Sequence, residues 1–177
     1  MISFEEIRVI TVVYLAVFFP LIIYFKNKDK LPNWVPTFYI VGVVVCSLGW
    51  ELWFSYGWIS GDGVDLRRSE SLNTWLPKDI NWLMNSMGDA GTVLLGGTWL
   101  MWVIHKKDQI VFKEWKWSGF CVLLTWCVTQ NILVEMFLYH DQLAEDKLLS
   151  WAPLSPLGPY FNPVLFEYND RTIMLQS

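Results

Sequence analysis

Three acidic residues stand inside strongly apolar stretches and are the first candidates for chemistry in this sequence: Glu51, Asp89 and Glu135. An ionisable side chain in the apolar core of a membrane costs about 2.5–3.5 kcal/mol on insertion scales, so such residues are functional candidates by default. Buried carboxyl groups that lie close together share protons, which yields a neutral acid beside a charged base. We therefore predict general acid and base catalysis, with these three residues as the candidate catalytic groups.

The stretches that carry these acids have the length of membrane spans. Of the 177 residues 54% are hydrophobic and only 17% are charged, against about 25% charged in soluble domains. The predicted spans are 9–25, 37–58, 80–104 and 117–139. Segment 148–166 is also apolar, but its four prolines each remove a backbone donor, which favours a broken fifth span or a re-entrant segment. The predicted fold is an all-α integral membrane bundle of four transmembrane helices plus this segment, in one domain, 1–177.

The three acids are expected to share one layer of this bundle. At 1.5 Å rise per residue, Glu51 lies about 10 Å, Asp89 about 13 Å and Glu135 about 6 Å from the same end of the spans. Other polar residues repeat at helical spacing and place one polar face of each helix inward. These residues include Ser47, Asn81, Asn85, Thr92, Gln130 and Asn131. Interhelical hydrogen bonding is their alternative role, and we take Asn85, Gln130 and Asn131 as candidate ligand-binding residues.

Tryptophan is abundant within the spans as well as at their ends. Four of the 12 tryptophans are candidates for ligand binding: Trp50, Trp53, Trp99 and Trp126. Aromatic faces attract cations, most strongly where water is excluded. Around a proton donor they would stabilise a carbocation formed from an olefin. The alternative for each is that it fills the bundle or faces lipid.

The remaining residues do not favour a metal or a cofactor. The only histidines, His105 and His140, end their spans on opposite faces, which disfavours a di-iron centre and a haem. No lysine lies in a span, which excludes a retinal Schiff base, and no nucleotide-binding motif appears. We expect no cofactor, although carboxylate and amide oxygens leave a hard-cation site open. With net charge −4 and no basic arm, a nucleic-acid partner is excluded.

Basic residues are concentrated in two loops. Loops 26–36 and 105–116 together carry seven lysines, so the positive-inside rule predicts that both are cytoplasmic. The loop between the second and third spans then lies on the opposite side, with the N-terminus. Its acidic and basic residues can pair with one another. We therefore expect this loop to be ordered.

Several motifs follow one another in a recognisable order. Gly49-Trp50-Glu51-Leu52-Trp53-Phe54 is followed by Asp65-Leu66-Arg67, then by Asp89, by Gln130 with Glu135, and by an aromatic, proline-containing segment, 151–166. This order, over about residues 9–166, resembles the emopamil-binding protein and sterol isomerase family, whose shared fold is the EXPERA domain. Ser47 stands four residues before Glu51, where that family usually has histidine. The Trp-Glu helix is also similar to the second span of fungal integral-membrane terpene cyclases. Both resemblances imply proton-initiated carbocation chemistry on a sterol or terpenoid.

Three functions fit these features. The first is a membrane isomerase or cyclase that acts on a sterol-like or terpenoid-like lipid, with Glu51 and Asp89 as proton donor and acceptor and Glu135 tuning them. The second is a non-enzymatic small subunit of a larger membrane complex, whose acids dock partner helices. The third is a lipid- or ion-binding module. The expected partners are accordingly a lipophilic small molecule, membrane lipid and, for the second function, membrane proteins.

Overall fold

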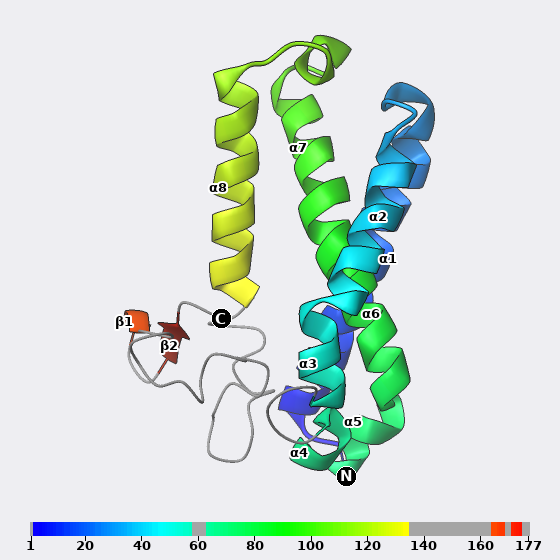
Figure 1. The fold of residues 1–177 in the computed structure, drawn as a ribbon, viewed down its shortest axis with the longest axis vertical. Coiled ribbons are helices and arrows are strands. Elements are labelled where there is room, and N and C mark those ends of the chain that lie inside the picture. The colour runs from blue at the N-terminus through cyan, green and yellow to red at the C-terminus, as the bar shows by residue number, and fades with distance from the viewer. Residues whose placement is uncertain (1, 58–62, 135–163, 169–170, 175–177) are drawn as a thin grey trace.

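The computed structural model describes residues 2–57, 63–134, 164–168 and 171–174, and this part of the chain is mostly helical (Figure 1). Three stretches, Glu6–Lys30, Val35–Tyr56 and Lys78–Ile104, are long and apolar enough to cross a membrane. The first three predicted spans are thus confirmed as helices of sufficient length. A fourth apolar helix, α8 (Trp117–Leu133), is shorter, and residues 135–139 of the predicted span 117–139 lie outside the described residues.

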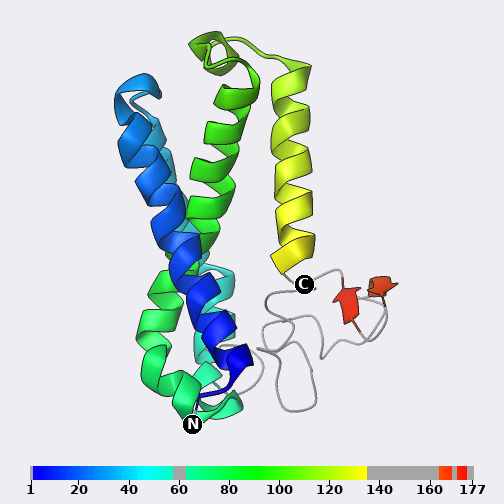
Figure 2. The ribbon, with the colours of Figure 1, turned by 180° about the vertical axis from the view of Figure 1, so that it is seen from behind.

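The first span, α1 (Phe4–Asn27), begins with a capping box. Ser3 Oγ accepts a hydrogen bond from the Glu6 N–H at 3.1 Å, and Glu6 Oε2 accepts from the Ser3 N–H at 2.6 Å. These bonds satisfy donors that the first helical turn would otherwise leave unpaired. From there α1 runs along α6 (Lys78–Ala90), as Figure 2 shows. The two helices approach closely at Gly88, where a Cβ would lie 3.2 Å from Ala16 Cβ.

The second span is interrupted at one residue. It consists of α2 (Val35–Leu48) and α3 (Trp50–Tyr56), separated by Gly49. The Gly49 N–H bonds to the Val45 oxygen at 2.9 Å, and a Cβ at this position would lie 2.7 Å from the same oxygen. Any larger residue would have to displace the backbone here. The interruption therefore depends on glycine, and it separates apolar α2 from α3, which carries Glu51.

The third span changes its helical type halfway. It runs from α6 through π-helical turns at Gly91–Gly96 into α7 (Gly97–Ile104). π-Helical turns are rare and occur mostly as short insertions in α-helices, frequently at functional sites. The α-helical half that carries Asp89 is thus set apart from the half that leads to the basic loop.

The two basic loops meet at one end of the molecule, the top of Figure 1. Gln109 Nε2 donates to the Lys30 oxygen at 2.9 Å, and the rings of Trp34 and Phe112 lie 6.0 Å apart with their planes nearly perpendicular. A short 3₁₀ helix in each loop, Lys28–Lys30 and Gln109–Phe112, contributes to these contacts. Loops 26–36 and 105–116 therefore lie at the same end of the molecule, which the prediction that both are cytoplasmic requires.

Two short helices cover the other end of the bundle. They are α4 (Val64–Arg67) and α5 (Glu70–Trp75), and we call residues 63–77 the cap. The Glu6 carboxylate accepts hydrogen bonds from Ser69 and Ser71, which ties the start of α1 to the cap. The cap also closes a hydrophobic core formed by Val9, Val13, Val17, Leu72, Leu76 and Met84. We predicted that the loop between the second and third spans is ordered. The cap has defined helices and contacts, as this prediction requires, while residues 58–62 lie outside the described part.

The C-terminal part departs from the prediction of an all-α fold. β1 (Val164–Tyr168) and β2 (Arg171–Met174) form an antiparallel hairpin. β1 contains the last three residues of segment 148–166, which we expected as a broken span or re-entrant segment. The β-branched and aromatic residues in this part of the sequence favour an extended strand over a helix. Residues 148–163 lie outside the described part, so the expectation is corrected for 164–166 alone.

Candidate functional site

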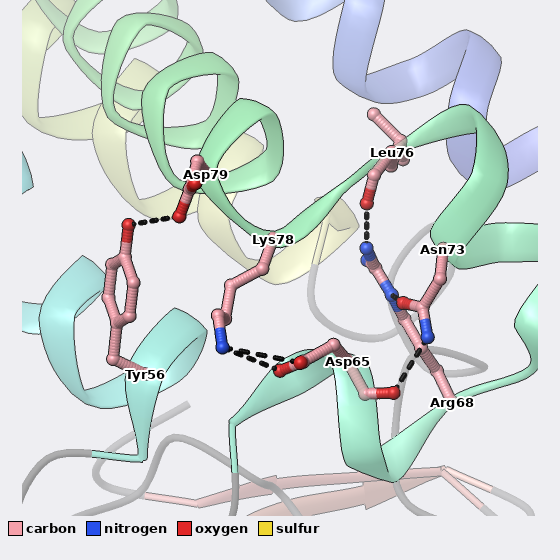
Figure 3. Close-up of polar contacts among 7 residues, drawn as sticks. All are labelled: Tyr56, Asp65, Arg68, Asn73, Leu76, Lys78 and Asp79. Carbon is pink, nitrogen blue, oxygen red and sulfur yellow. Dashed lines mark hydrogen bonds and ion pairs between the residues drawn. The ribbon is translucent and has the colours of Figure 1, made fainter.

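Two side-chain hydrogen bonds join α3 to α6. Trp50 Nε1 donates to Asp89 Oδ2 at 2.8 Å, and the Tyr56 hydroxyl donates to Asp79 Oδ1 at 2.8 Å (Figure 3 shows the second bond). Because the first bond joins the start of α3 to the end of α6 and the second does the reverse, the helices are antiparallel. Residues 51–55 of α3 therefore lie beside residues 80–88 of α6.

Four of the buried polar side chains in these two stretches recur at four-residue spacing. Glu51 is 5% exposed and Asn85 8% exposed, while Ser55 and Asn81 are fully buried. Together with Asp89 they are called the polar cluster below. Within each helix the members are four residues apart, so they occupy one face. Polar groups are costly inside an apolar bundle. A cluster of five along these two neighbouring helices therefore requires an explanation beyond packing.

The two acids of the cluster lie near each other along the paired helices. Trp50 and Tyr56 of α3 bond to Asp89 and Asp79 of α6, so Glu51 lies beside the end of α6 that carries Asp89. Trp50, which precedes Glu51, holds the Asp89 carboxylate. The structure thus brings two of the three predicted acids into one layer. The third, Glu135, lies outside the described residues.

The tryptophans predicted around the acids do not all lie there. Trp50 binds Asp89 directly, whereas the side chain of Trp53 lies outside the described part. Trp99 follows Asp89 by ten residues, about 15 Å along a helix, and packs against a core at the basic end. Trp126 donates to the Thr92 oxygen at 2.8 Å and lies against Gly96. Trp99 is therefore left out of the proposed site.

The two polar candidates on α8 contact their own helix or the surroundings. Gln130 Nε2 donates to the Cys127 oxygen at 3.2 Å, and Asn131 is exposed. Ligand binding by either residue stays a prediction. By contrast, some polar residues near the cluster clearly serve helix packing: Trp82 Nε1 donates to the Ser47 oxygen at 2.8 Å and Ser86 Oγ to the Trp82 oxygen at 2.7 Å.

The cap contributes a residue that sequence reasoning missed. Arg68 Nη1 donates to Asn81 Oδ1 at 2.9 Å. Arg68 also donates to Asn73 Oδ1 and to the Leu76 oxygen, and Figure 3 shows these two contacts. We expected charged residues of this loop to pair internally, and Lys78 with Asp65 at 3.2 Å is such a pair. In these three hydrogen bonds Arg68 donates to neutral oxygens. No sequence spacing relates residue 68 to residue 81, so this link could not be predicted.

A second missed residue had a recognisable signal. Ser55 stands four residues after Glu51, which itself stands four after Ser47, so it continues the stripe that was used to identify the polar face. Its complete burial makes it a member of the cluster. The polar stripe of Ser47 and Glu51 therefore continues for one further helical turn to Ser55.

The cluster offers proton transfer and hydrogen bonding. Among the described residues no three His, Cys, Asp or Glu side chains come together in a way that would hold a metal ion. Two carboxyl groups, two amides and one hydroxyl remain, and each can donate or accept a hydrogen bond in some protonation state. Only the carboxyl groups can exchange protons with a bound molecule near neutral pH.

Comparison with known proteins does not identify the chain: no protein-family model matches it, and neither does any curated protein or solved structure. The resemblance to sterol isomerases and terpene cyclases therefore stays an expectation that rests on the motifs quoted above. Function must be argued from the polar cluster itself.

Proposed function

We propose that this protein is a multi-pass integral membrane enzyme that isomerises or cyclises a sterol-like or terpenoid-like lipid by proton transfer at Glu51 and Asp89. The observation that carries the proposal is the position of these two acids. Glu51 is buried on α3, and Asp89 on α6 accepts a hydrogen bond from the indole of Trp50. Both acids lie in helices that are apolar enough to cross a membrane. Two acids in one desolvated layer are what a proton relay through a lipophilic substrate requires.

The surface of the spans supports placement in a bilayer. Large apolar side chains on α1, such as Leu15, Phe18 and Phe25, are more than half exposed. Lipid tails would cover these side chains, and the backbone polar groups between the first and last turns of a helix are satisfied internally, as a bilayer demands. In this arrangement loops 26–36 and 105–116 face the cytoplasm and the cap faces the other side.

The two acids have different surroundings, which suggests their roles. The Trp50 indole N–H donates to one oxygen of Asp89, which orients the carboxyl group that we assign as the proton acceptor. Glu51, buried on the neighbouring helix, is then the proton donor. Protonation of an olefin carbon by Glu51 forms a carbocation, and transfer of a proton from an adjacent carbon to Asp89 forms the shifted double bond. One proton enters and one leaves, so the product is an isomer of the substrate.

Deuterium exchange tests this mechanism without a known substrate. Proteoliposomes in deuterated water are incubated with geranylgeraniol, with ergosterol, or with a lipid extract of the expressing cells, and carbon-bound deuterium is measured by mass spectrometry. We expect incorporation into at least one lipid. Glu51→Gln and Asp89→Asn should each reduce it at least about 100-fold, the lower end of the contribution of general acid–base catalysis.

The matched control is Glu114→Gln, which removes an exposed carboxylate from the basic loop and should leave exchange unchanged. Exchange at the unmodified rate in both cluster variants would end the acid–base proposal. Absence of exchange in the unmodified protein with all three lipid preparations would end it as well.

A second candidate, a non-enzymatic subunit of a larger membrane complex, is favoured by one observation. Val164, Leu165 and Phe166 are consecutive on β1 and each is about half exposed, so both faces of the strand present apolar side chains. Exposed apolar strands are sites of association with other chains. Recovery of the same membrane protein with both unmodified and Glu51→Gln protein, in the absence of exchange, would support this candidate.

A further inference from the structure

Two amide atoms of the polar cluster have no hydrogen-bond partner. Asn81 Nδ2 and Asn85 Oδ1 are both buried, and neither forms a hydrogen bond within the described structure. The residues are one helical turn apart on α6, so their side chains are neighbours. Buried amide groups nearly always have a partner, because an unpaired one forfeits its hydration without compensation. The pair is therefore incomplete as it stands.

Arg68 of the cap determines which amide atom of Asn81 has no hydrogen-bond partner in the described structure. The oxygen and nitrogen of an amide have nearly the same shape, so their assignment depends on their partners. Arg68 has donors only, and it approaches one Asn81 atom at 2.9 Å. That atom must be the oxygen. The unpartnered atom is consequently a nitrogen, which presents a hydrogen-bond donor to the interior.

We propose that Asn81 and Asn85 form a subsite that binds a hydroxyl group of the lipid ligand. This inference rests on the proposed function and names the class of its substrate, a lipophilic alcohol. The ligand oxygen accepts a hydrogen bond from Asn81 Nδ2, and its O–H donates to Asn85 Oδ1. An ether oxygen would satisfy only Asn81, and a hydrocarbon would satisfy neither. Ser55 Oγ, fully buried on the facing helix and also without a hydrogen bond, offers the hydroxyl a third partner.

The spacing along α6 also limits where the reacting carbon lies. Asn81 and Asn85 precede Asp89 by eight and four residues, about 12 and 6 Å along the helix axis. A hydroxyl bound between them therefore lies roughly 6–12 Å from the carbon that reacts at Asp89. The hydroxyl end of the ligand lies toward the cap. The substrate is thus an alcohol whose double bond is several carbons away from its oxygen.

Binding of matched probes tests the subsite. Affinities of the purified protein are measured by competition against tritiated geranylgeraniol and tritiated cholesterol. The competitors are each alcohol, its methyl ether and the hydrocarbon that lacks the oxygen. In at least one series we expect the alcohol to bind at least about tenfold more tightly than the hydrocarbon, because a polar site left unpaired rejects the analogue that cannot satisfy it. The ether should lie between them.

Asn85→Leu is the informative variant, because the hydrogen bonds from Arg68 to Asn73, Asn81 and the Leu76 oxygen are all retained in it. It should abolish the difference between alcohol and ether and leave hydrocarbon affinity within about twofold. Asn33→Leu, at an exposed position in loop 26–36, is the matched control and should retain the preference. Asn81→Leu should also lose the preference, but it removes a partner of Arg68, so it is interpreted only where thermal unfolding matches the unmodified protein.

Equal affinity for alcohol and hydrocarbon in both series, or no binding of either alcohol, would overturn the subsite. A trapped water would then be the partner of the two amides. The outcome is independent of the deuterium assay. A hydroxyl preference without exchange retains the subsite and contradicts the enzyme. Exchange without a hydroxyl preference contradicts the subsite and retains the enzyme.

Discussion

The indole of Trp126 on α8 donates a hydrogen bond to the main-chain oxygen of Thr92 at 2.8 Å, and so joins α8 to the third span. Thr92 lies within the π-helical turns Gly91–Gly96, where the change in hydrogen-bond register alters the pairing of backbone oxygens. Glycines provide room for the ring, since a Cβ at Gly97 would lie 3.4 Å from Trp126 Cδ1. The acceptor thus lies within the π-helical turns, and the glycines allow α8 to reach it.

Trp126→Phe should therefore weaken the docking of α8. The ring remains but the N–H is lost, and a typical internal hydrogen bond contributes about 0.5–1.5 kcal/mol. We expect a lower melting temperature in detergent and faster amide exchange in α8. Trp117→Phe, at an exposed tryptophan near the start of the same helix, is the control. Equal melting temperatures for both variants would show that the Trp126 bond does not stabilise the bundle.

Arg68→Lys should loosen the cap. The planar guanidinium reaches Asn73, Asn81 and the Leu76 oxygen at once, which a single ammonium cannot do. Hydrogen bonds from charged donors contribute about 1.5–3 kcal/mol each in favourable sites, so a loss of at least about 1.5 kcal/mol is expected. Amide exchange at residues 69–76 should accelerate. Lys78→Arg, which retains the pair with Asp65, should change little, and an unaltered exchange pattern in Arg68→Lys would contradict this role.

Trp50→Phe separates positioning of Asp89 from packing. Phenylalanine retains an aromatic ring but cannot donate to the Asp89 carboxylate. Because misplacement of a reacting group by about 1 Å costs up to 100-fold, deuterium exchange should fall between about 10- and 100-fold, with little change in melting temperature. Trp75→Phe, at an exposed tryptophan of the cap, serves as control. An unchanged rate in Trp50→Phe would mean that the indole does not position the base.

Topology can be checked with a membrane-impermeant thiol reagent. The background variant Cys121→Ala removes the exposed native thiol. One new cysteine at a time is then introduced at an exposed position by Asn33→Cys, Glu114→Cys or Leu66→Cys. We expect the first two to be labelled from the cytoplasmic side and the third from the opposite side. Labelling of the first two from different sides would be incompatible with the contact between Gln109 and Lys30.

Local sequence patterns were enough to predict the helices of the bundle. The lengths of three spans follow from stretches that are apolar on average, because a helix satisfies its own backbone groups in an apolar medium. The four-residue spacing of Asn81, Asn85 and Asp89 likewise places them on one face wherever the helix lies. The hairpin also had a local signal, since Asn169 and Asp170, residue types that favour turns, separate two strand-forming runs.

The partners of those faces were decided by tertiary structure alone. Trp50 and Asp89 are 39 residues apart and Arg68 and Asn81 are 13 apart, and neither separation corresponds to a helical repeat. Periodicity specifies which residues share a face but not how far each helix turns about its own axis toward its neighbour. Close contacts such as Gly88 on Ala16 determine that rotation, because only small residues let the two backbones approach. The sequence by itself therefore determined the spans, their polar faces and the depth of each acid, whereas packing decided that Trp50 binds Asp89 and that Arg68 binds Asn81.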